Sequence, residues 1–312
     1  GALLAQRVPA KTVLELDLEK GVVEYIHPSP VSYFTVGKQT TMFEAVTALS
    51  QASRDSRVVG LVAKIGSSGM GWARVQELRD AIAAFRASGK KAFAYAETFG
   101  EFGPGNGAYY LATAFDSIFL QPSGDIGLTG LMVQTPFVKG TLEKLGVRPQ
   151  LDHREEYKSA LYSLTQKEYV APHAEENREL MGSLLSDLVD GIVAGRSLSR
   201  DSVPTLIENG PYSSHTALKR RLVDSLAYRD EVYDIVEKGF GKGATFLSLR
   251  SYLNRTDDPY GKGPTIALIY GVGNVVRGKS GFAALTGEQL MGSETIAAAF
   301  RAALKDKSVK AI

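Results

Sequence analysis

The sequence contains no cysteine, and this absence removes several chemistries at once. A thiol nucleophile, a disulfide framework and a zinc site built on cysteines are all excluded. Histidine is scarce, and its four occurrences are His27, His153, His173 and His215. These residues form neither an H-E-x-x-H pair nor another zinc-ligand spacing, so we expect each of them in a loop or on the surface.

An excess of charge of one sign is also lacking. The chain has 36 basic and 34 acidic residues, which are interspersed and give a net charge of +2. Nucleic-acid binding needs a clustered excess of Lys and Arg, so we expect no nucleic-acid partner.

No apolar run approaches the roughly 20 residues that span a bilayer. Because the chain begins with Gly1, we expect that a signal or anchor segment precedes it in the whole protein.

What the sequence does contain is an alternation of strand and helix patterns. Strands are predicted at 12–18, 21–26, 58–65, 91–96 and 117–121, and helices at 40–53, 75–85 and 107–114. This alternation favours a parallel sheet covered by helices, and therefore an α/β fold. Residues 166–240 form a predicted α-rich appendage, in which the helical pattern of 166–195 is interrupted near Pro172.

An internal repeat organises the chain. Residues 12–23 align with 265–276, and residues 44–62 align with 294–312. Two separate stretches with nearly the same offset indicate two copies of one domain. The first copy is predicted to cover 1–262, and the second to begin at 263 and to stop at 312 in mid-strand.

The segment 271–281 contains the phosphate-loop pattern G-x-x-x-x-G-K-[ST], which ends at Lys279 and Ser280. A phosphate loop needs a tight turn that caps a helix. Val275 and Val276 are β-branched instead and favour a strand. We therefore interpret the match as chance, exclude an ATPase, and predict that residues 273–277 are extended.

Two glycine-rich turns occur between residues 98 and 131. The first runs into a helix at Gly107, and the second contains Gly124, Gly127 and Gly130. Such turns can aim backbone N–H groups at a developing oxyanion. The same glycines can also simply make tight connections between strands and helices, and the residues alone leave both interpretations open.

A further candidate is Lys158, in the segment 153–163. A lysine is usually a solvated charge, but a desolvated lysine becomes neutral and can act as a general base toward a Ser hydroxyl. Tyr157, Ala160 and Leu161 supply apolar surface beside Lys158. Partial burial of its amine is therefore expected.

Three segments resemble the signal peptide peptidase A family of serine–lysine proteases, in its long tandem-repeat form; they are 107–131, 142–160 and 210–226. The resemblance implies an α/β fold like that of crotonases and Clp proteases, built from stacked ββα units. It implies that the first repeat supplies the general base, which maps onto Lys158, and that the second supplies a nucleophilic serine. The corresponding turn, 105–109, holds Asn106 in the place of that serine. An amide cannot form an acyl-enzyme here, so we expect this chain alone to be inactive and the nucleophile to lie beyond residue 312.

The sequence departs from the family pattern at two places. The family's Ser-Pro-Gly-Gly turn is replaced by residues 66–72. Glu155, followed by Glu156, stands where the family usually has Gly. Carboxylates near Lys158 would raise its pKa and favour the charged form, which is wrong for a base. The assignment of Lys158 therefore requires both carboxylates to point to solvent.

The resemblance also implies a biological setting. It implies a peptidase of the bacterial inner membrane that faces the periplasm, degrades released signal peptides and needs no cofactor or metal. Membrane attachment would come from a segment outside this chain, and homo-oligomer contacts from residues 166–240. Two alternatives remain open: a non-catalytic assembly module of the same fold, since no nucleophile is visible, and a crotonase-type acyl-CoA enzyme.

Overall fold

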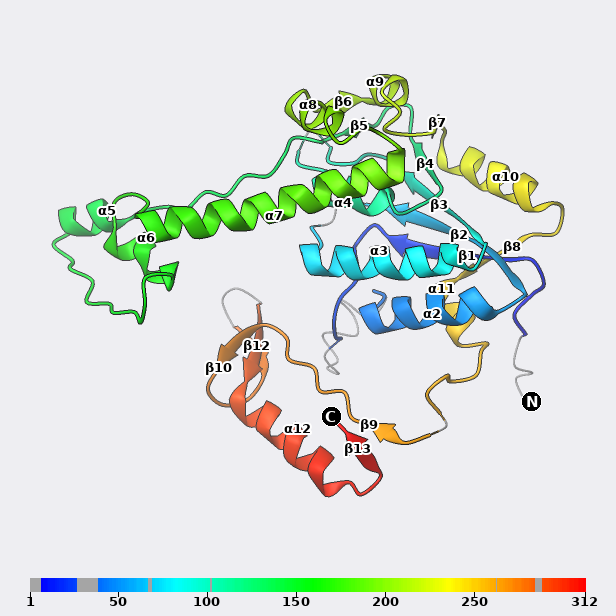
Figure 1. Ribbon diagram of the computed structural model, residues 1–312. Helices are drawn as coiled ribbons and strands as arrows, with labels where there is room; N and C mark the ends of the chain where they lie inside the picture. Colours follow the sequence, from blue (N-terminus) through cyan, green and yellow to red (C-terminus); the bar gives the residue numbers. More distant parts are fainter. Residues whose placement is uncertain (1–6, 27–38, 67–68, 102, 262, 284–287) are drawn as a thin grey trace. The chain divides into compact units, whose positions relative to one another are not determined.

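The computed structural model describes residues 7–26, 39–66, 69–101, 103–261, 263–283 and 288–312. They form two compact units (Figure 1). One unit is Gly1–Tyr95 together with Arg229–Ile312, and the other is Ala96–Tyr228. His27 and residues 67 and 68 of the segment 66–72 lie outside the described residues.

The first unit is built on parallel strands. β1 (Thr12–Leu18) pairs on one side with β2 (Val58–Ile65) and on the other with β8 (Thr245–Ser248), and β2 pairs with β3 (Lys91–Ala96). β1 and β2 are runs of Val, Leu and Ile whose side chains are largely buried, as expected for strands covered on both faces. The predicted α/β class with a parallel sheet is confirmed.

Two helices make the connections between these strands. α2 (Met42–Arg54) begins with a capping box, in which the Thr41 hydroxyl accepts from the Glu44 N–H and the Glu44 carboxylate accepts from the Thr41 N–H. α3 (Trp72–Ala87) buries Val75, Leu78, Ile82 and Phe85, the positions that its sequence periodicity predicts. α10 (Arg229–Phe240) and α11 (Leu249–Leu253) complete this part of the unit.

The second unit combines short strands with a long helix. α4 (Asn106–Ala112) precedes β4 (Ser117–Leu120), which pairs in parallel with β7 (Ser225–Leu226); β5 (Asp125–Ile126) pairs antiparallel with β6 (Tyr212–Ser213). The remaining helices are α5 (Lys139–Lys144), the 3₁₀ helix η1 (Ser159–Leu161), α6 (Tyr162–Thr165), α7 (Ala171–Arg196), α8 (Ser202–Glu208) and α9 (Ser214–Lys219). α5 and α6 lie at the N-terminal end of α7 (Figure 1).

The C-terminal end of α7 is tied to the strands of its own unit. The guanidinium of Arg196 donates to both carboxylate oxygens of Asp224, at 2.8 and 2.9 Å. The same carboxylate accepts the backbone N–H of Ile118, at the start of β4. α7 is therefore fixed at one end, and its other end carries the candidate site described below.

One local prediction is wrong. Residues 21–26 form no strand, and only Val23 makes an isolated bridge, to Thr41. The predicted break in the helical pattern of 166–195 is present as the start of a helix. Residues 166–170 are not helical, and α7 begins at Ala171 with Pro172 in its first turn, where the missing N–H costs no helical hydrogen bond. The segment 166–240 is rich in helix, as predicted, and it also contains the two-residue strands β6 and β7.

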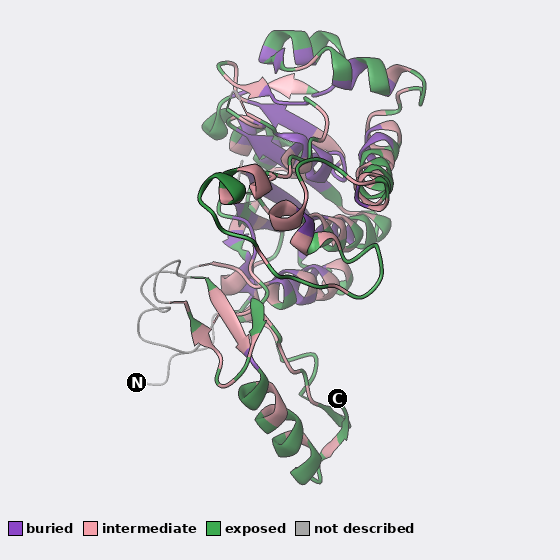
Figure 2. Cartoon of the chain, turned by 90° about the vertical axis from the view of Figure 1, so that its left-hand side faces the viewer, coloured by how far each residue is buried: buried purple, intermediate pink, exposed green. Residues whose placement is uncertain are grey.

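The pairing pattern of the first strands recurs near the C-terminus. Thr12 pairs with Val58 and Val13 with Gly60, and in the same order Thr265 of β9 (Thr265–Ile266) pairs with Val309 and Ile266 with Ala311 of β13 (Val309–Ala311). β10 (Asn274–Val276) pairs in parallel with β12 (Gln289–Gly292), which also pairs with β11 (Gly281–Phe282) and leads into α12 (Ser293–Lys305). α12 buries none of its residues (Figure 2).

Within the described residues, no helix is both long enough and apolar enough to cross a membrane.

Candidate active site

Lys158 lies directly before η1, in the segment that joins α5 to α6. Its side chain is exposed, and so is that of Tyr157, which is 49% exposed. The partial burial expected for Lys158 is therefore not found in this chain. The neighbours of Lys158 do not shield it: none of the residues Ser159–Leu161 is buried, and the buried residue of this segment is Tyr162.

The backbone before Lys158 has an unusual conformation. Glu155 adopts a φ of 68°, in the left-handed region that glycine occupies most easily. This is the position at which the resemblance leads one to expect Gly. The side chains of Glu155 and Glu156 are exposed, as the assignment of Lys158 requires, and among the described residues neither forms an ion pair with Lys158.

An aromatic cluster lies beneath this segment. His173 of α7 is only 5% exposed, and its ring lies 4.8 Å from that of Tyr169, 5.7 Å from that of Tyr162 and 6.0 Å from that of Phe137 (centroid distances). The expectation of a surface histidine is therefore wrong for His173, because its position on the inward face of α7 outweighs the average tendency of histidine. His153 is half-buried and His215 is exposed.

The two glycine-rich turns pair with each other. The N–H of Gly105 donates to the carbonyl of Gly127 at 2.7 Å, and the N–H of Gly127 donates to the carbonyl of Phe99 at 2.6 Å. A Cβ at Gly127 would collide with the carbonyl of Gly103 in the facing turn, and a Cβ at Gly105 would collide with the carbonyl of Phe99 in its own turn. These two glycines are therefore needed for close packing of backbone against backbone.

Asn106 lies buried at the first position of α4, where the resemblance places a nucleophile. Its Oδ1 accepts the N–H groups of Thr129 and Gly130 at 3.1 and 3.2 Å, and its Nδ2 donates to the carbonyl of Gly130 at 2.7 Å. The N–H groups of Thr129 and Gly130 thus already have an acceptor. In this turn they do not offer a vacant oxyanion site.

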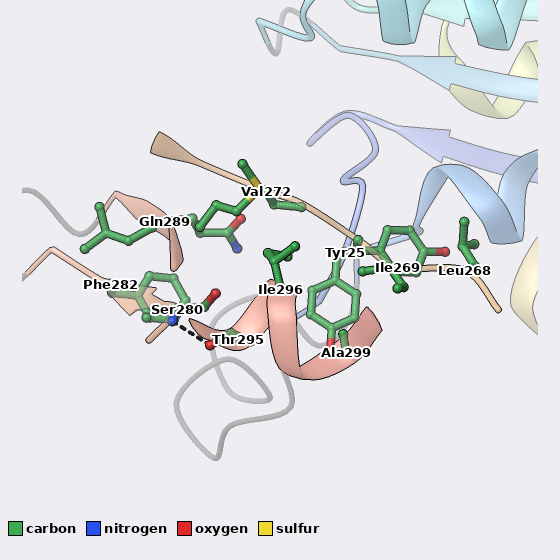
Figure 3. A pocket seen from close by; sticks show the side chains of 14 residues that line it. Tyr25, Leu268, Ile269, Val272, Ser280, Phe282, Gln289, Thr295, Ile296 and Ala299 are labelled. Atoms are coloured by element: carbon green, nitrogen blue, oxygen red, sulfur yellow. Dashed lines mark hydrogen bonds between the residues drawn. The ribbon is translucent and has the colours of Figure 1, made fainter. Parts of the chain in front are cut away.

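The phosphate-loop pattern does not form a phosphate loop. Asn274–Val276 is strand β10, so the predicted extended conformation of 273–277 is found in its three central residues, while Gly273 adopts a φ of 91°. Ser280 is followed by strand β11 rather than by a helix. Its N–H donates to the Thr295 hydroxyl (Figure 3). Its own hydroxyl accepts from the N–H of Gly292.

An apolar cavity of about 410 Å³ adjoins Ser280 (Figure 3). Its other lining residues include Tyr25, Tyr270, Phe282, Met291 and Ile296, and the rings of Tyr25 and Tyr270 stack at 5.1 Å. Among the described residues, no Lys, His, Asp or Glu lines the cavity. The described lining therefore offers no group that could activate the hydroxyl of Ser280. The described residues also contain no cluster of His, Asp or Glu suited to hold a metal ion.

Comparison with known proteins gives a family match over half of the chain. The model of Peptidase family S49 matches residues 84–242, a range that includes both Asn106 and Lys158. The chain is 31% identical over 195 residues to Serine protease SPPA, chloroplastic, of Arabidopsis thaliana, covering 61% of this chain and 28% of that protein. It is 27% identical over 287 residues to Protease 4 of Salmonella typhi, covering 88% of this chain and 45% of that protein.

The chain therefore spans less than half of the length of these two relatives. Among solved structures, a membrane-bound stomatin-specific protease is similar over 72% of this chain and 84% of its own, with 11% identity and a TM-score of 0.34. An enoyl-CoA hydratase of Mycobacterium smegmatis is similar over 64% of each chain, with 11% identity and a TM-score of 0.35.

Proposed function

Because the chain belongs to Peptidase family S49, and its relatives include proteins named SPPA and Protease 4, we propose that it is part of a serine endopeptidase with a Ser–Lys dyad. The observation that carries the proposal is the family match over 84–242, which contains Tyr157-Lys158-Ser159-Ala160. In this proposal Lys158 is the general base, and this chain contributes the lysine but not the serine.

The proposed reaction needs only protein groups. In this reaction the amine of Lys158 must be neutral, which requires that the rest of the whole protein shield from water the side chain that is exposed in this chain. The neutral amine then accepts the proton of a serine hydroxyl, and the serine oxygen bonds to the scissile carbonyl carbon. Backbone N–H groups hold the resulting oxyanion. The intermediate then collapses, the peptide C–N bond breaks, and the lysine returns its proton to the leaving amine. Water hydrolyses the acyl-enzyme with the same lysine as base.

The geometry of Asn106 supports the division of the dyad between two repeats. Its amide is not a nucleophile, and it is held by three hydrogen bonds to Thr129 and Gly130. The recurrence of the pairing between β1 and β2 in β9 and β13 supports a second copy of the domain that begins near residue 263. In this proposal that second copy supplies the serine.

The proposed substrates are signal peptides released after secretion. These peptides carry an apolar stretch of about 7–15 residues, and burial of apolar surface favours their transfer from water into the membrane. We place the protein at the bacterial inner membrane, facing the periplasm, with attachment through a segment outside this chain. Homo-oligomer contacts would involve residues 166–240. This setting is taken from the family resemblance.

The alternative is a non-catalytic assembly module, which the buried amide of Asn106 in the nucleophile's place also fits. Hydrolysis of a synthetic signal peptide by the whole protein separates the two. Lys158→Ala should abolish turnover without unfolding the protein, because the side chain is exposed. Lys158→Arg should be equally inactive, since guanidinium does not release its proton.

Lys167→Ala is the matched control for this experiment. Lys167 is also an exposed lysine of the segment before α7, and it pairs with Glu143 rather than with the candidate site. Its removal should leave turnover within about twofold, since exposed ion pairs contribute at most about 1 kcal/mol. Turnover by Lys158→Ala at the level of Lys167→Ala would contradict the proposal.

A further inference from the structure

Two side chains hold the two carbonyl groups that precede the Tyr157–Lys158 pair. Nδ1 of His153 lies 2.8 Å from the carbonyl oxygen of Glu155. The Tyr162 hydroxyl donates to the carbonyl of Glu156 at 2.7 Å. Because a carbonyl only accepts, His153 must carry a proton on Nδ1 in this contact.

The two holding side chains also contact each other. The rings of His153 and Tyr162 meet edge to face, with centroids 5.0 Å apart and an interplanar angle of 87°. Tyr162 is only 6% exposed and rests against His173 of α7. His153 and Tyr162 are thus supported by α7, a helix of 26 residues, and not by another loop.

A third contact ties the segment to the same helix. The Tyr157 hydroxyl donates to the carboxylate of Glu175 at 2.9 Å, and this bond raises the pKa of Tyr157. Three consecutive residues are therefore held, Glu155 and Glu156 through their carbonyls and Tyr157 through its side chain. Lys158 follows immediately.

We infer that His153 and Tyr162 are positioning residues, which fix the backbone that carries the general base. The inference rests on the proposed function, in which Lys158 is that base. A lysine amine must reach hydrogen-bond distance of the serine oxygen. The lysine side chain has four torsions, so it can place the amine reproducibly at that distance only if its Cα is fixed. Non-glycine residues seldom adopt the left-handed conformation of Glu155. The bond from His153 to the Glu155 carbonyl helps to hold this turn.

The test compares kinetic constants of variants in the whole protein with a synthetic signal peptide as substrate. Tyr162→Phe keeps the ring and removes only the donor to Glu156. Since a misplacement of about 1 Å can cost about 100-fold in rate, kcat should fall about 10- to 100-fold while KM stays within about twofold. Tyr169→Phe is the control, because Tyr169 belongs to the same aromatic cluster but its hydroxyl accepts from Thr135 instead. Its kcat should stay within about twofold of the native value.

His153 provides a second, independent test. His153→Ala removes the donor to the Glu155 carbonyl, and kcat should fall as for Tyr162→Phe. His153→Asn places an amide N–H close to the position of Nδ1 and should restore at least half of the native kcat. The thermal midpoints of His153→Ala and His153→Asn should be equal. If they are, the recovery of kcat in His153→Asn cannot be explained by a role of His153 in stability alone.

Different results would refute the Ser–Lys dyad and the positioning role of His153 and Tyr162. If Lys158→Ala is inactive but Tyr162→Phe and His153→Ala both keep the kcat of Tyr169→Phe, the positioning role is refuted and the dyad stands. If Lys158→Ala keeps its activity, the dyad is refuted and the positioning role with it.

Discussion

The side-chain amide of Asn106 bonds both backbone polar groups of Gly130. Its Oδ1 accepts the Gly130 N–H at 3.2 Å, and its Nδ2 donates to the Gly130 carbonyl at 2.7 Å. Asn106 is 4% exposed, so this contact connects the start of α4 to the second glycine-rich turn from within the core. Asn106 is therefore a structural link between α4 and this turn.

The first prediction concerns this link. Asn106→Ser should destabilise the protein by about 1–3 kcal/mol, because a serine is too short to satisfy both groups of Gly130. It should not create peptidase activity in the first repeat. The free energy of unfolding in denaturant measures the effect. Asn209→Ser is the control, since Asn209 is exposed and bonds only Thr205 of its own helix; an equal loss in both variants would contradict the structural role.

The second prediction concerns residues 1–312 as an isolated chain. We expect no hydrolysis of a signal peptide above the buffer rate, because in the proposed division of the dyad this chain contributes the base but not the nucleophile. Addition of the segment beyond residue 312, in one chain with it, should restore turnover. Hydrolysis by the isolated chain that disappears in a serine variant within 1–312 would show that the active site is not divided.

The third prediction concerns the phosphate-loop pattern. Calorimetry should detect no ATP binding at micromolar concentration, and Lys279→Ala should change nothing. The reason is that β10 occupies the place of the phosphate-cradling turn, and Ser280 is already bonded to Thr295 and Gly292. Micromolar binding that Lys279→Ala abolishes would contradict this reading.

The fourth prediction concerns acid stability. Asp55, at the C-terminal end of α2, has a lowered pKa, mainly because its carboxylate accepts hydrogen bonds from the Arg57 side chain. A lowered folded-state pKa stabilises the protein above the unfolded value of about 3.9, and the contribution is lost as the pH falls through the folded value. Asp55→Asn should therefore lower the thermal midpoint at pH 7, and the difference should shrink below about pH 4. A constant difference from pH 7 to pH 3 would contradict this assignment.

The sequence predicted the strands well where apolar runs are long. Val58–Ile65 and Lys91–Ala96 form strands with the predicted bounds, because buried parallel strands leave a continuous apolar signal. The failure at residues 21–26 has a local cause: they carry the same signal, but among the described residues only Val23 has a bridge partner. The helix boundary that the sequence places near Pro172 is the start of α7, because a proline in the first turn loses no helical hydrogen bond.

The candidate site was less predictable. A motif identifies Lys158, but the sequence cannot show that the nearby aromatic surface belongs to Tyr162 and His173 and leaves the lysine exposed. His153 and Tyr162 hold backbone carbonyls, and such contacts follow no residue pattern. The departure from glycine at Glu155 was the one available signal, since a non-glycine residue at positive φ needs a compensating contact.

The central claim is that Lys158 activates a serine of the second repeat. A fluorophosphonate probe tests it most directly, because such a probe reacts with an activated serine without requiring a bound peptide. In the whole protein, mass spectrometry of the labelled chain should place one stoichiometric label on a serine beyond residue 312, and Lys158→Ala should abolish this labelling while Lys167→Ala keeps it. A label within residues 1–312, or labelling of Lys158→Ala at the native rate, would contradict the account.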